Sequence, residues 1–180
     1  MGLFAEKGKV IKADPRCKDV CKAAADIPGI AKGGGTVICL DGGKVKCICQ
    51  FNFPFPGGSI KPGECPSFDA CIQRHEQAHI DDGLGLCDPR NPTPHPMRFP
   101  DTERQKKSEC RHRLDDISCL QSVKGDSNPK CTQAADALIG MQETYVKAHN
   151  CHEVLRDVRI CTCVSNNTYG VPTVCRGGHK

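Results

Sequence analysis

Apolar and polar residues alternate along residues 36–51, where two runs rich in Val, Ile and Cys flank an Asp-Gly-Gly turn at 41–43. An alternation of period two predicts a β-hairpin with one buried face. Elsewhere the apolar positions recur three or four residues apart, which is the period of an amphipathic helix. The expected helices cover residues 14–26, 67–82, 102–122 and 129–156, with a break around Asn150 in the last.

The segments between these elements are rich in proline and glycine, and we expect them to be loops. They cover residues 28–35, 52–66 and 87–100, and a strand or extended segment is expected at 159–164. A chain of 180 residues is expected to form one α+β domain, mainly helical with a small β-hairpin. Its parts are a helix and hairpin region at 1–66, a helical core at 67–156 and an extended segment at 157–180.

The helix expected at 67–82 carries an apolar stripe that continues into two histidines. Its members recur at spacings of four, three and four: Phe68, Ile72, His75 and His79. Ser67 is the expected N-cap of this helix, and Gly83 is its expected stop. A single histidine on a buried face is usually a satisfied core residue, but two at this spacing with a glutamate between them indicate a shared ligand.

The two histidines belong to the sequence His75-Glu76-Gln77-Ala78-His79, an H-E-x-x-H motif. Residues four apart lie on one face of a helix, so both imidazoles can bind one metal ion, and Zn2+ is the expected one. Glu76 then lies at the open side of the ion, where it can take a proton from water. Chance alone gives this motif in roughly 1 in 100 chains of such length and composition.

A zinc site of this type needs a third protein ligand, and Glu109 is the expected one. The short-spaced H-E-x-x-H-x-x-G-x-x-H ligand set is excluded, because Asp82 and Gly85 stand where it needs glycine and histidine. His112 and Asp116 lie on the same side of their helix as Glu109, and we expect them to orient a liganding imidazole or to replace a ligand. The other candidate ligands are Asp82, His95, His112 and Glu143.

The chain contains 15 cysteines, which approaches the content of a disulfide scaffold. None of them forms a C-x-x-C pair. The close pairs are Cys17/Cys21, Cys47/Cys49 and Cys161/Cys163. Most cysteines are therefore expected in disulfides formed in an oxidising compartment rather than in metal clusters, and the odd count leaves at least one thiol free or joined to another molecule.

The start of the chain has no apolar core of signal-peptide length, and no later segment approaches a membrane span. Either a signal has been removed or the domain reaches its destination as cargo, and no membrane insertion is expected. The formal charge of +4 is modest and the basic residues are dispersed, so we expect a solvated surface and no nucleic-acid partner.

Residues 71–82, with Ser108-Glu109-Cys110 and Ile117-Ser118-Cys119-Leu120, resemble the compact zincin-type metallopeptidase domains that form the toxin tips of bacterial secreted effectors. The resemblance covers about 50 residues and is strongest over the H-E-x-x-H motif. In many of these domains a downstream S-E-x-x-A-Y-like helix contributes the third ligand, whereas His112 and Arg113 replace the Ala-Tyr pair here.

This resemblance implies a zincin-like core and a zinc peptidase in which His75, His79 and Glu109 are ligands and Glu76 is the general base. It also implies delivery to the bacterial periplasm by a type VI or related system, with a cognate immunity protein as partner. Such a route accounts for many cysteines without a signal peptide.

The expected function is therefore a zinc-dependent metallopeptidase that acts on a protein or peptide substrate in an oxidising compartment, as an antibacterial effector toxin domain. The hairpin at 36–51 is expected to supply an edge strand for the substrate. The candidates for stabilising the oxyanion are Tyr145, Tyr169, His149 and His152. Two alternatives stay open: a zinc amidase or peptidase acting on peptidoglycan, and a non-enzymatic, disulfide-rich secreted binding protein in which the two histidines are structural.

Overall fold

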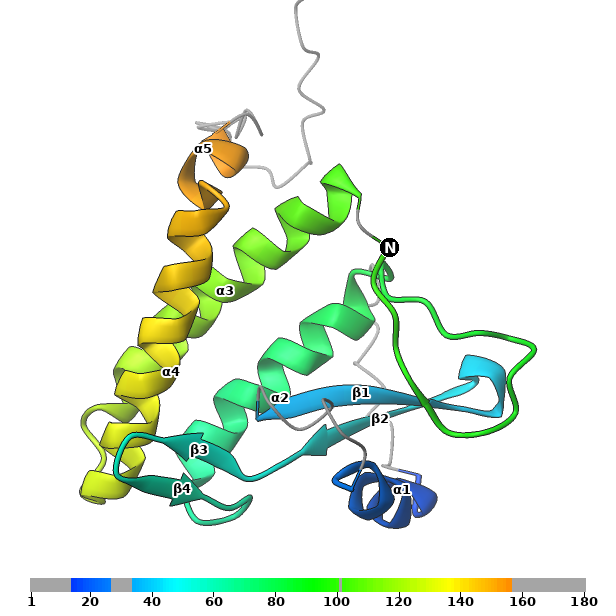
Figure 1. Cartoon of the computed structure of the whole chain (residues 1–180), viewed down its shortest axis with the longest axis horizontal. Helices are drawn as coiled ribbons and strands as arrows, with labels where there is room; N and C mark the ends of the chain where they lie inside the picture. Colours follow the sequence, from blue (N-terminus) through cyan, green and yellow to red (C-terminus); the bar gives the residue numbers. More distant parts are fainter. Residues whose placement is uncertain (1–13, 27–33, 101, 157–180) are drawn as a thin grey trace, which may run out of the picture.

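The computed structural model describes residues 14–26, 34–100 and 102–156 (Figure 1). The helices among them are α1 (Arg16–Ala24), α2 (Pro66–Asp81), α3 (Glu103–Val123), α4 (Pro129–Ala148) and α5 (Cys151–Arg156). The strands are β1 (Gly35–Leu40), β2 (Val45–Gln50), β3 (Phe53–Phe55), β4 (Gly58–Ile60) and β5 (His95–Pro96). The predicted disulfide-stapled α+β fold is confirmed. The segment expected at 159–164 and most of the loop expected at 28–35 lie outside the described residues.

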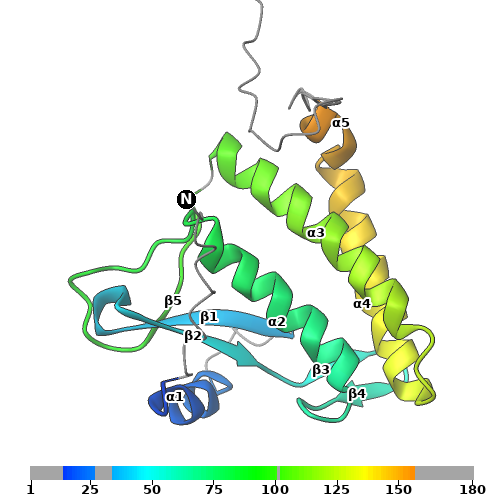
Figure 2. The ribbon, with the colours of Figure 1, turned by 180° about the vertical axis from the view of Figure 1, so that it is seen from behind.

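Helix α2 occupies the middle of the fold (Figures 1 and 2). It packs against β1 and β2 on one side and against α3 on the other, and α4 in turn packs against α3. Helix α1 lies against β2. The helix that carries the H-E-x-x-H motif is therefore enclosed by the sheet and by the α3–α4 pair.

Strands β1 and β2 form the predicted hairpin and pair antiparallel over their full length. Their turn at Asp41–Gly43 needs a backbone that is unfavourable for most residues, because Gly42 has φ +66° and Gly43 has φ +88°. Strand β5 pairs with the other edge of β1, opposite Ile38 and Cys39. The sheet order is therefore β2-β1-β5.

Both faces of β1 are buried, which corrects the prediction of one buried face. Ile38 and Leu40 pack in an apolar cluster with residues of α1, and Val37 and Cys39 pack in another with Met97. The reason is tertiary, since α1 covers one face and the chain returns after α2 to cover part of the other (Figure 2).

The segment 52–66 contains a second hairpin, β3–β4, so the prediction that it is only a loop is wrong. Phe53, Phe55 and Ile60 are buried in the main apolar core. Gly57 provides the turn with φ +97°. Strand pairing is favourable here because α4 packs on both strands, a contact that no local pattern reveals.

Helix α2 begins at Pro66 with Cys65 as its N-cap, so the cap expected at Ser67 is wrong. The Ser67 hydroxyl instead donates a hydrogen bond of 2.9 Å to Asp126 Oδ2. Proline suits the first helical position because its missing N–H has no helical partner there. Gly83, with φ +64°, follows the end of the helix as predicted.

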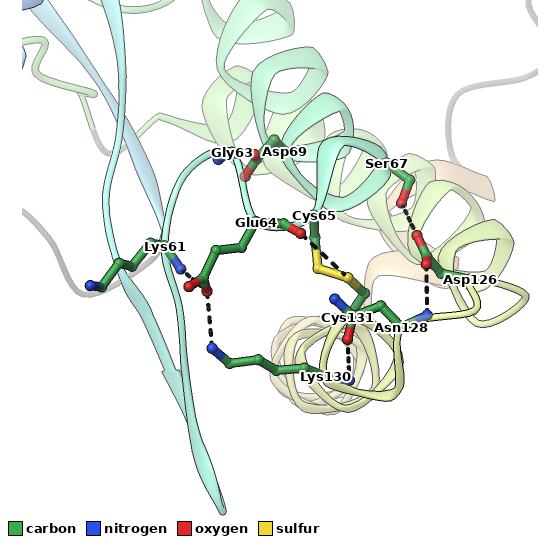
Figure 3. Close-up of a disulfide and its surroundings, with 10 residues drawn as sticks. All are labelled: Lys61, Gly63, Glu64, Cys65, Ser67, Asp69, Asp126, Asn128, Lys130 and Cys131. Atoms are coloured by element: carbon green, nitrogen blue, oxygen red, sulfur yellow. Dashed lines mark hydrogen bonds and ion pairs between the residues drawn. A yellow bond between two sulfur atoms is a disulfide. The ribbon is translucent and has the colours of Figure 1, made fainter.

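The N-terminal ends of α2 and α4 are fastened together (Figure 3). The disulfide Cys65–Cys131 joins the residue before α2 to the first turn of α4. Beside it, Glu64 Oε2 accepts from the Lys61 backbone N–H at 2.9 Å and from Lys130 Nζ at 3.0 Å. The exposed ion pair adds little stability, so the disulfide is the main constraint on where α2 starts.

Helices α3, α4 and α5 follow the predicted boundaries closely. The Thr102 side chain caps α3, and the Asn128 side chain caps α4. Asn150, with φ +49°, separates α4 from α5, which confirms the expected break.

Six disulfides join the cysteines of the described residues, and each links two different segments of the fold. The pairs are Cys17–Cys47, Cys21–Cys49, Cys39–Cys87, Cys65–Cys131, Cys71–Cys119 and Cys110–Cys151. Such a set indicates an oxidising, extracellular compartment. Within the described ranges, no helix has the length and apolar character that crossing a membrane requires.

Candidate metal centre

His75 and His79 project from the face of α2 that meets α3, and they continue the buried stripe of Phe68 and Ile72 as predicted. Their Nε2 atoms lie 3.0 Å apart. Two nitrogen ligands of a tetrahedral zinc ion lie about 3.3 Å apart when each Zn–N bond is about 2.0 Å. The two lone pairs can therefore meet at one ion after a shift of a few tenths of an ångström.

Glu109 comes to the same point from α3. This helix runs back along α2 in the opposite direction (Figures 1 and 2), and the disulfide Cys71–Cys119 ties the two helices together. Glu109 Oε1 lies 3.5 Å from His79 Nε2. One ligand atom from each of His75, His79 and Glu109 lies within 4.8 Å of the others.

The donor set fits a zinc ion. Two imidazoles and one carboxylate are a ligand set that catalytic zinc accepts, and three protein ligands leave a fourth coordination position for water or substrate. The residues predicted as ligands are thus brought together, and their role as ligands stays a prediction.

Glu76 is buried beside the two histidines, under the first residues of β1. A Cβ atom on Gly35 would lie 3.0 Å from Glu76 Oε1 and 2.6 Å from Ile72 Cγ2, so a side chain at that position collides with the site. Burial raises the pKa of Glu76 to about 7. The carboxyl group can therefore exchange a proton near neutral pH.

The two histidines differ in charge preference. Burial, together with the neighbouring His75 and His112, lowers the pKa of His79 to about 3, so this imidazole is neutral and has a free lone pair. Burial also opposes the charged form of His75, but the hydrogen bond and negative charge of Asp116 outweigh it and raise the pKa of His75. Protons therefore compete with a metal ion for His75 more strongly than for His79.

Asp116 is in the place that the sequence predicted for an outer partner. Its Oδ2 atom lies 2.7 Å from His75 Nδ1, which leaves Nε2 of that ring directed toward His79. A carboxylate behind a liganding imidazole fixes the ring orientation and increases its basicity. The same oxygen accepts a 3.0 Å hydrogen bond from Gln142 Nε2 on α4.

Asp82 and His112 form a second group on the other side of His79. His112 Nε2 lies 3.5 Å from Asp82 Oδ2, and the Ser108 hydroxyl donates a short hydrogen bond to the same oxygen. One ligand atom from each of Asp82, His112 and His79 lies within 4.8 Å of the others. Both sets need His79, so they compete for this imidazole, and only the first set lies beside Glu76.

The remaining candidate ligands are elsewhere. His95 bonds with the loop around it, accepting from the Asp88 backbone N–H at 3.1 Å and contacting the Thr93 carbonyl at 2.8 Å. Glu143 is exposed on α4 and does not line the pocket at the histidines.

A pocket of about 300 Å³ opens at the histidines. Its polar wall includes Glu76, Glu109 and Arg113. Its apolar wall consists of Ile72, Phe99, Leu138 and Met141. Met141 is 51% exposed and Phe99 38%, so these two apolar side chains stand at the mouth of the pocket.

Sequence reasoning missed two polar residues of this pocket as functional candidates, Arg113 and Gln142. Arg113 follows Glu109 by one helical turn, and its Nε atom lies 3.4 Å from Glu109 Oε2. The i,i+4 spacing of the two residues indicates this pairing. Gln142 comes from α4 and carries no local signal at all.

Of the residues expected to stabilise an oxyanion, the three that the structure describes do not line this pocket. The Tyr145 ring lies under the Arg113 guanidinium, with 4.0 Å between the ring centroid and Cζ, and the His149 ring lies 4.1 Å from that of Tyr145. His152 is exposed on α5, and Tyr169 is outside the described residues. Arg113 is the cation that the structure places at the pocket instead.

Comparisons of the chain with protein-family models, with curated proteins and with solved structures find no match. The functional conclusion therefore depends on the geometry of the site.

Proposed function

We propose that this chain is a zinc-dependent metallopeptidase of the zincin type. The supporting observation is the convergence of His75 Nε2, His79 Nε2 and the Glu109 carboxylate beside the buried Glu76, on the wall of an open pocket. A solvated helix that matched the motif by chance would not bury His79, partly bury His75 and bring a carboxylate from another helix to them.

The residues divide the chemistry of amide hydrolysis between them. A zinc ion held by His75, His79 and Glu109 would supply Lewis acidity toward a carbonyl oxygen and an attacking water. Glu76 would take the proton of that water and pass it to the leaving amine. Asp116 keeps the His75 ring in the orientation that presents Nε2.

An extended peptide fits the pocket beside the sheet. Within the described ranges, β5 pairs with β1 only at Ile38 and Cys39, and Gly35 and Thr36 at the start of β1 line the pocket. Backbone groups at such a strand end can bond to an extended substrate. The apolar side chains at the pocket mouth suit a substrate side chain next to the cleaved bond.

An antibacterial effector domain that works in the periplasm is the biological role we propose. The six disulfides require an oxidising compartment, and a peptidase confined to that compartment spares the cytoplasm of the cell that makes it. A cognate immunity protein is then the expected partner.

Zinc content and the Glu76→Gln variant test the proposed activity. We expect about one zinc per chain after chelator-free purification, and we expect Glu76→Gln to keep zinc and fold while hydrolysis of casein falls by about 100-fold or more. The matched control is Glu103→Gln, which changes an exposed glutamate of α3 and should keep full activity.

The outcomes separate the alternatives. A zinc-free protein after metal-replete purification would favour the non-enzymatic binding protein. Zinc with cleavage of muropeptides and no cleavage of casein would assign the site to peptidoglycan. Wild-type turnover in Glu76→Gln would exclude this residue as the base.

A further inference from the structure

The outer contacts of two proposed metal ligands meet at one side chain of α4. Behind His75 stands Asp116, 2.7 Å from the ring, and behind Glu109 stands Arg113, with 3.4 Å between Oε2 and Nε. Gln142 contacts both of these outer residues: its Oε1 accepts from Arg113, and its Nε2 donates to Asp116 at 3.0 Å. The contacts therefore form a continuous chain from His75 to Glu109.

We propose that Gln142 is a positioning residue of the metal centre, which holds His75 and Glu109 in place together through Asp116 and Arg113. The proposal rests on the proposed zinc site. It assigns α4, which supplies no proposed ligand, a direct part in setting the ligand geometry.

A neutral amide is the group that this position requires. Arg113 needs an acceptor, and Asp116, as a carboxylate, needs a donor. The glutamine amide offers both, and the charges decide its orientation, with the oxygen toward the cation and the nitrogen toward the anion. A carboxylate here would repel Asp116, and an ammonium would repel Arg113.

Because these side chains are buried, loss of either hydrogen bond is costly. Gln142 is 5% exposed and Asp116 is 6% exposed, so neither side chain can exchange its partner for bulk water at low cost. Tyr145, one turn further along α4, supports the Arg113 guanidinium from below at 4.0 Å. Helix α4 thus contacts Arg113 through two side chains, Gln142 and Tyr145.

Zinc affinity and the visible spectrum of the cobalt-substituted protein test the role of Gln142. Gln142→Met keeps the side-chain length and removes both hydrogen bonds, and we expect zinc affinity to fall about 10- to 100-fold, as for other outer partners of metal ligands. The cobalt ligand-field bands, which report ligand geometry, should shift or weaken. Gln133→Met on the exposed side of the same helix is the control and should change neither.

An isosteric variant separates positioning from packing. Gln142→Glu should weaken zinc binding, because the introduced carboxylate cannot donate to Asp116 and repels it. Glutamate has the size of glutamine and keeps an acceptor for Arg113, so this variant changes the contact with Asp116 and leaves the packing of the side chain unchanged. We expect its zinc affinity to fall by about tenfold or more.

Metal-free thermal midpoints, measured in parallel, identify a structural effect. Lower midpoints with unchanged zinc affinity and cobalt spectra in Gln142→Met and Gln142→Glu would overturn the proposal. If wild-type protein itself binds no zinc or cobalt, the proposed metal centre fails, and the Gln142 proposal fails with it. A wild type that binds tightly while Gln142→Met binds equally well refutes only the role of Gln142.

Discussion

At the scale of single residues, the site depends on a carboxyl group that water cannot easily reach. Glu76 lies against Gly35, where any side chain would collide with it. Its burial makes the protonated form favourable in the metal-free protein and raises its pKa to about 7. The burial that raises the pKa of Glu76 therefore makes the stability of the metal-free protein sensitive to pH.

The stability of the metal-free protein should show this sensitivity. Glu76 titrates near 4.5 when unfolded and about 7 when folded, so the unfolded state releases its proton first and wild-type stability falls as pH rises through this window. Glu76→Gln lacks this loss, and its advantage over wild type should grow by about 1 to 3 kcal/mol between pH 4.5 and 8. Urea unfolding in chelator measures both proteins, and the contribution of His79 cancels in their difference. A constant difference across this range would contradict the assigned pKa.

The third ligand can be identified by comparing two carboxylates. Glu109→Ala removes the proposed carboxylate ligand, whose Oε1 lies 3.5 Å from His79 Nε2, and should weaken zinc binding by about 100-fold or more. Asp82→Ala removes a group already bonded to Ser108, and the expected loss is below about tenfold. Competition titration against a chromophoric chelator gives both values. Equal losses, or a larger loss for Asp82→Ala, would transfer the ligand role to the set around His112.

At the scale of elements, the proposed metal centre lies where α2 and α3 run side by side, and one disulfide fixes their contact. Cys71 precedes His75 by one turn of α2, and Cys119 follows Asp116 by three residues on α3. The bond therefore closes the helix pair one turn from the proposed ligand His75 and its partner.

Removal of this disulfide should damage metal binding more than removal of another. Cys71–Cys119 spans 48 residues and Cys17–Cys47 spans 30. The entropic contributions of loops of these lengths differ by only about 0.4 kcal/mol, so each double Cys→Ser variant should lose a similar stability, about 2 to 4 kcal/mol. Only the Cys71/Cys119 variant should lose zinc affinity, by about tenfold or more, because only that pair joins the two ligand helices. Equal zinc affinities in the two folded variants would show that packing alone holds the helices in place.

At the scale of the whole molecule, the disulfides connect the small sheet, the motif helix and the α3–α4 pair into one unit. The pairs at Cys17–Cys47 and Cys21–Cys49 hold α1 on the sheet, and Cys65–Cys131 holds the start of α2 on α4. A chain with 4% aromatic residues has few large side chains for its core, so cross-links replace part of the apolar packing.

Activity should therefore depend on the compartment. We expect the protein to be tolerated in a bacterial cytoplasm, where thiols stay reduced, and to be toxic when an added signal peptide exports it to the periplasm. Glu76→Gln and a cognate immunity protein should each abolish this toxicity. Growth curves with matched expression levels measure the effect. Equal toxicity in both compartments, or an active protein whose cysteines titrate mostly as free thiols, would refute the dependence on disulfides.

The sequence by itself determined the features that follow from the spacing of apolar residues over a short stretch or from the residues at the ends of a helix or strand. The alternation around Asp41–Gly43 identified the first hairpin, and the spacing of apolar residues identified the helices and the buried face that presents His75 and His79. These predictions succeeded because side-chain direction along a helix or strand follows from backbone geometry alone.

Tertiary structure decided the features that depend on which segments meet. Only the packing of α3 on α2 brings Glu109 rather than His95 or Glu143 to the histidines, and only α4 brings Gln142 behind them. The disulfide pairing, the burial of both faces of β1 and the β3–β4 hairpin were equally hidden from the sequence. Each arises from contacts between residues far apart in the chain, and residue spacing carries no information about such contacts until the helices and strands have packed.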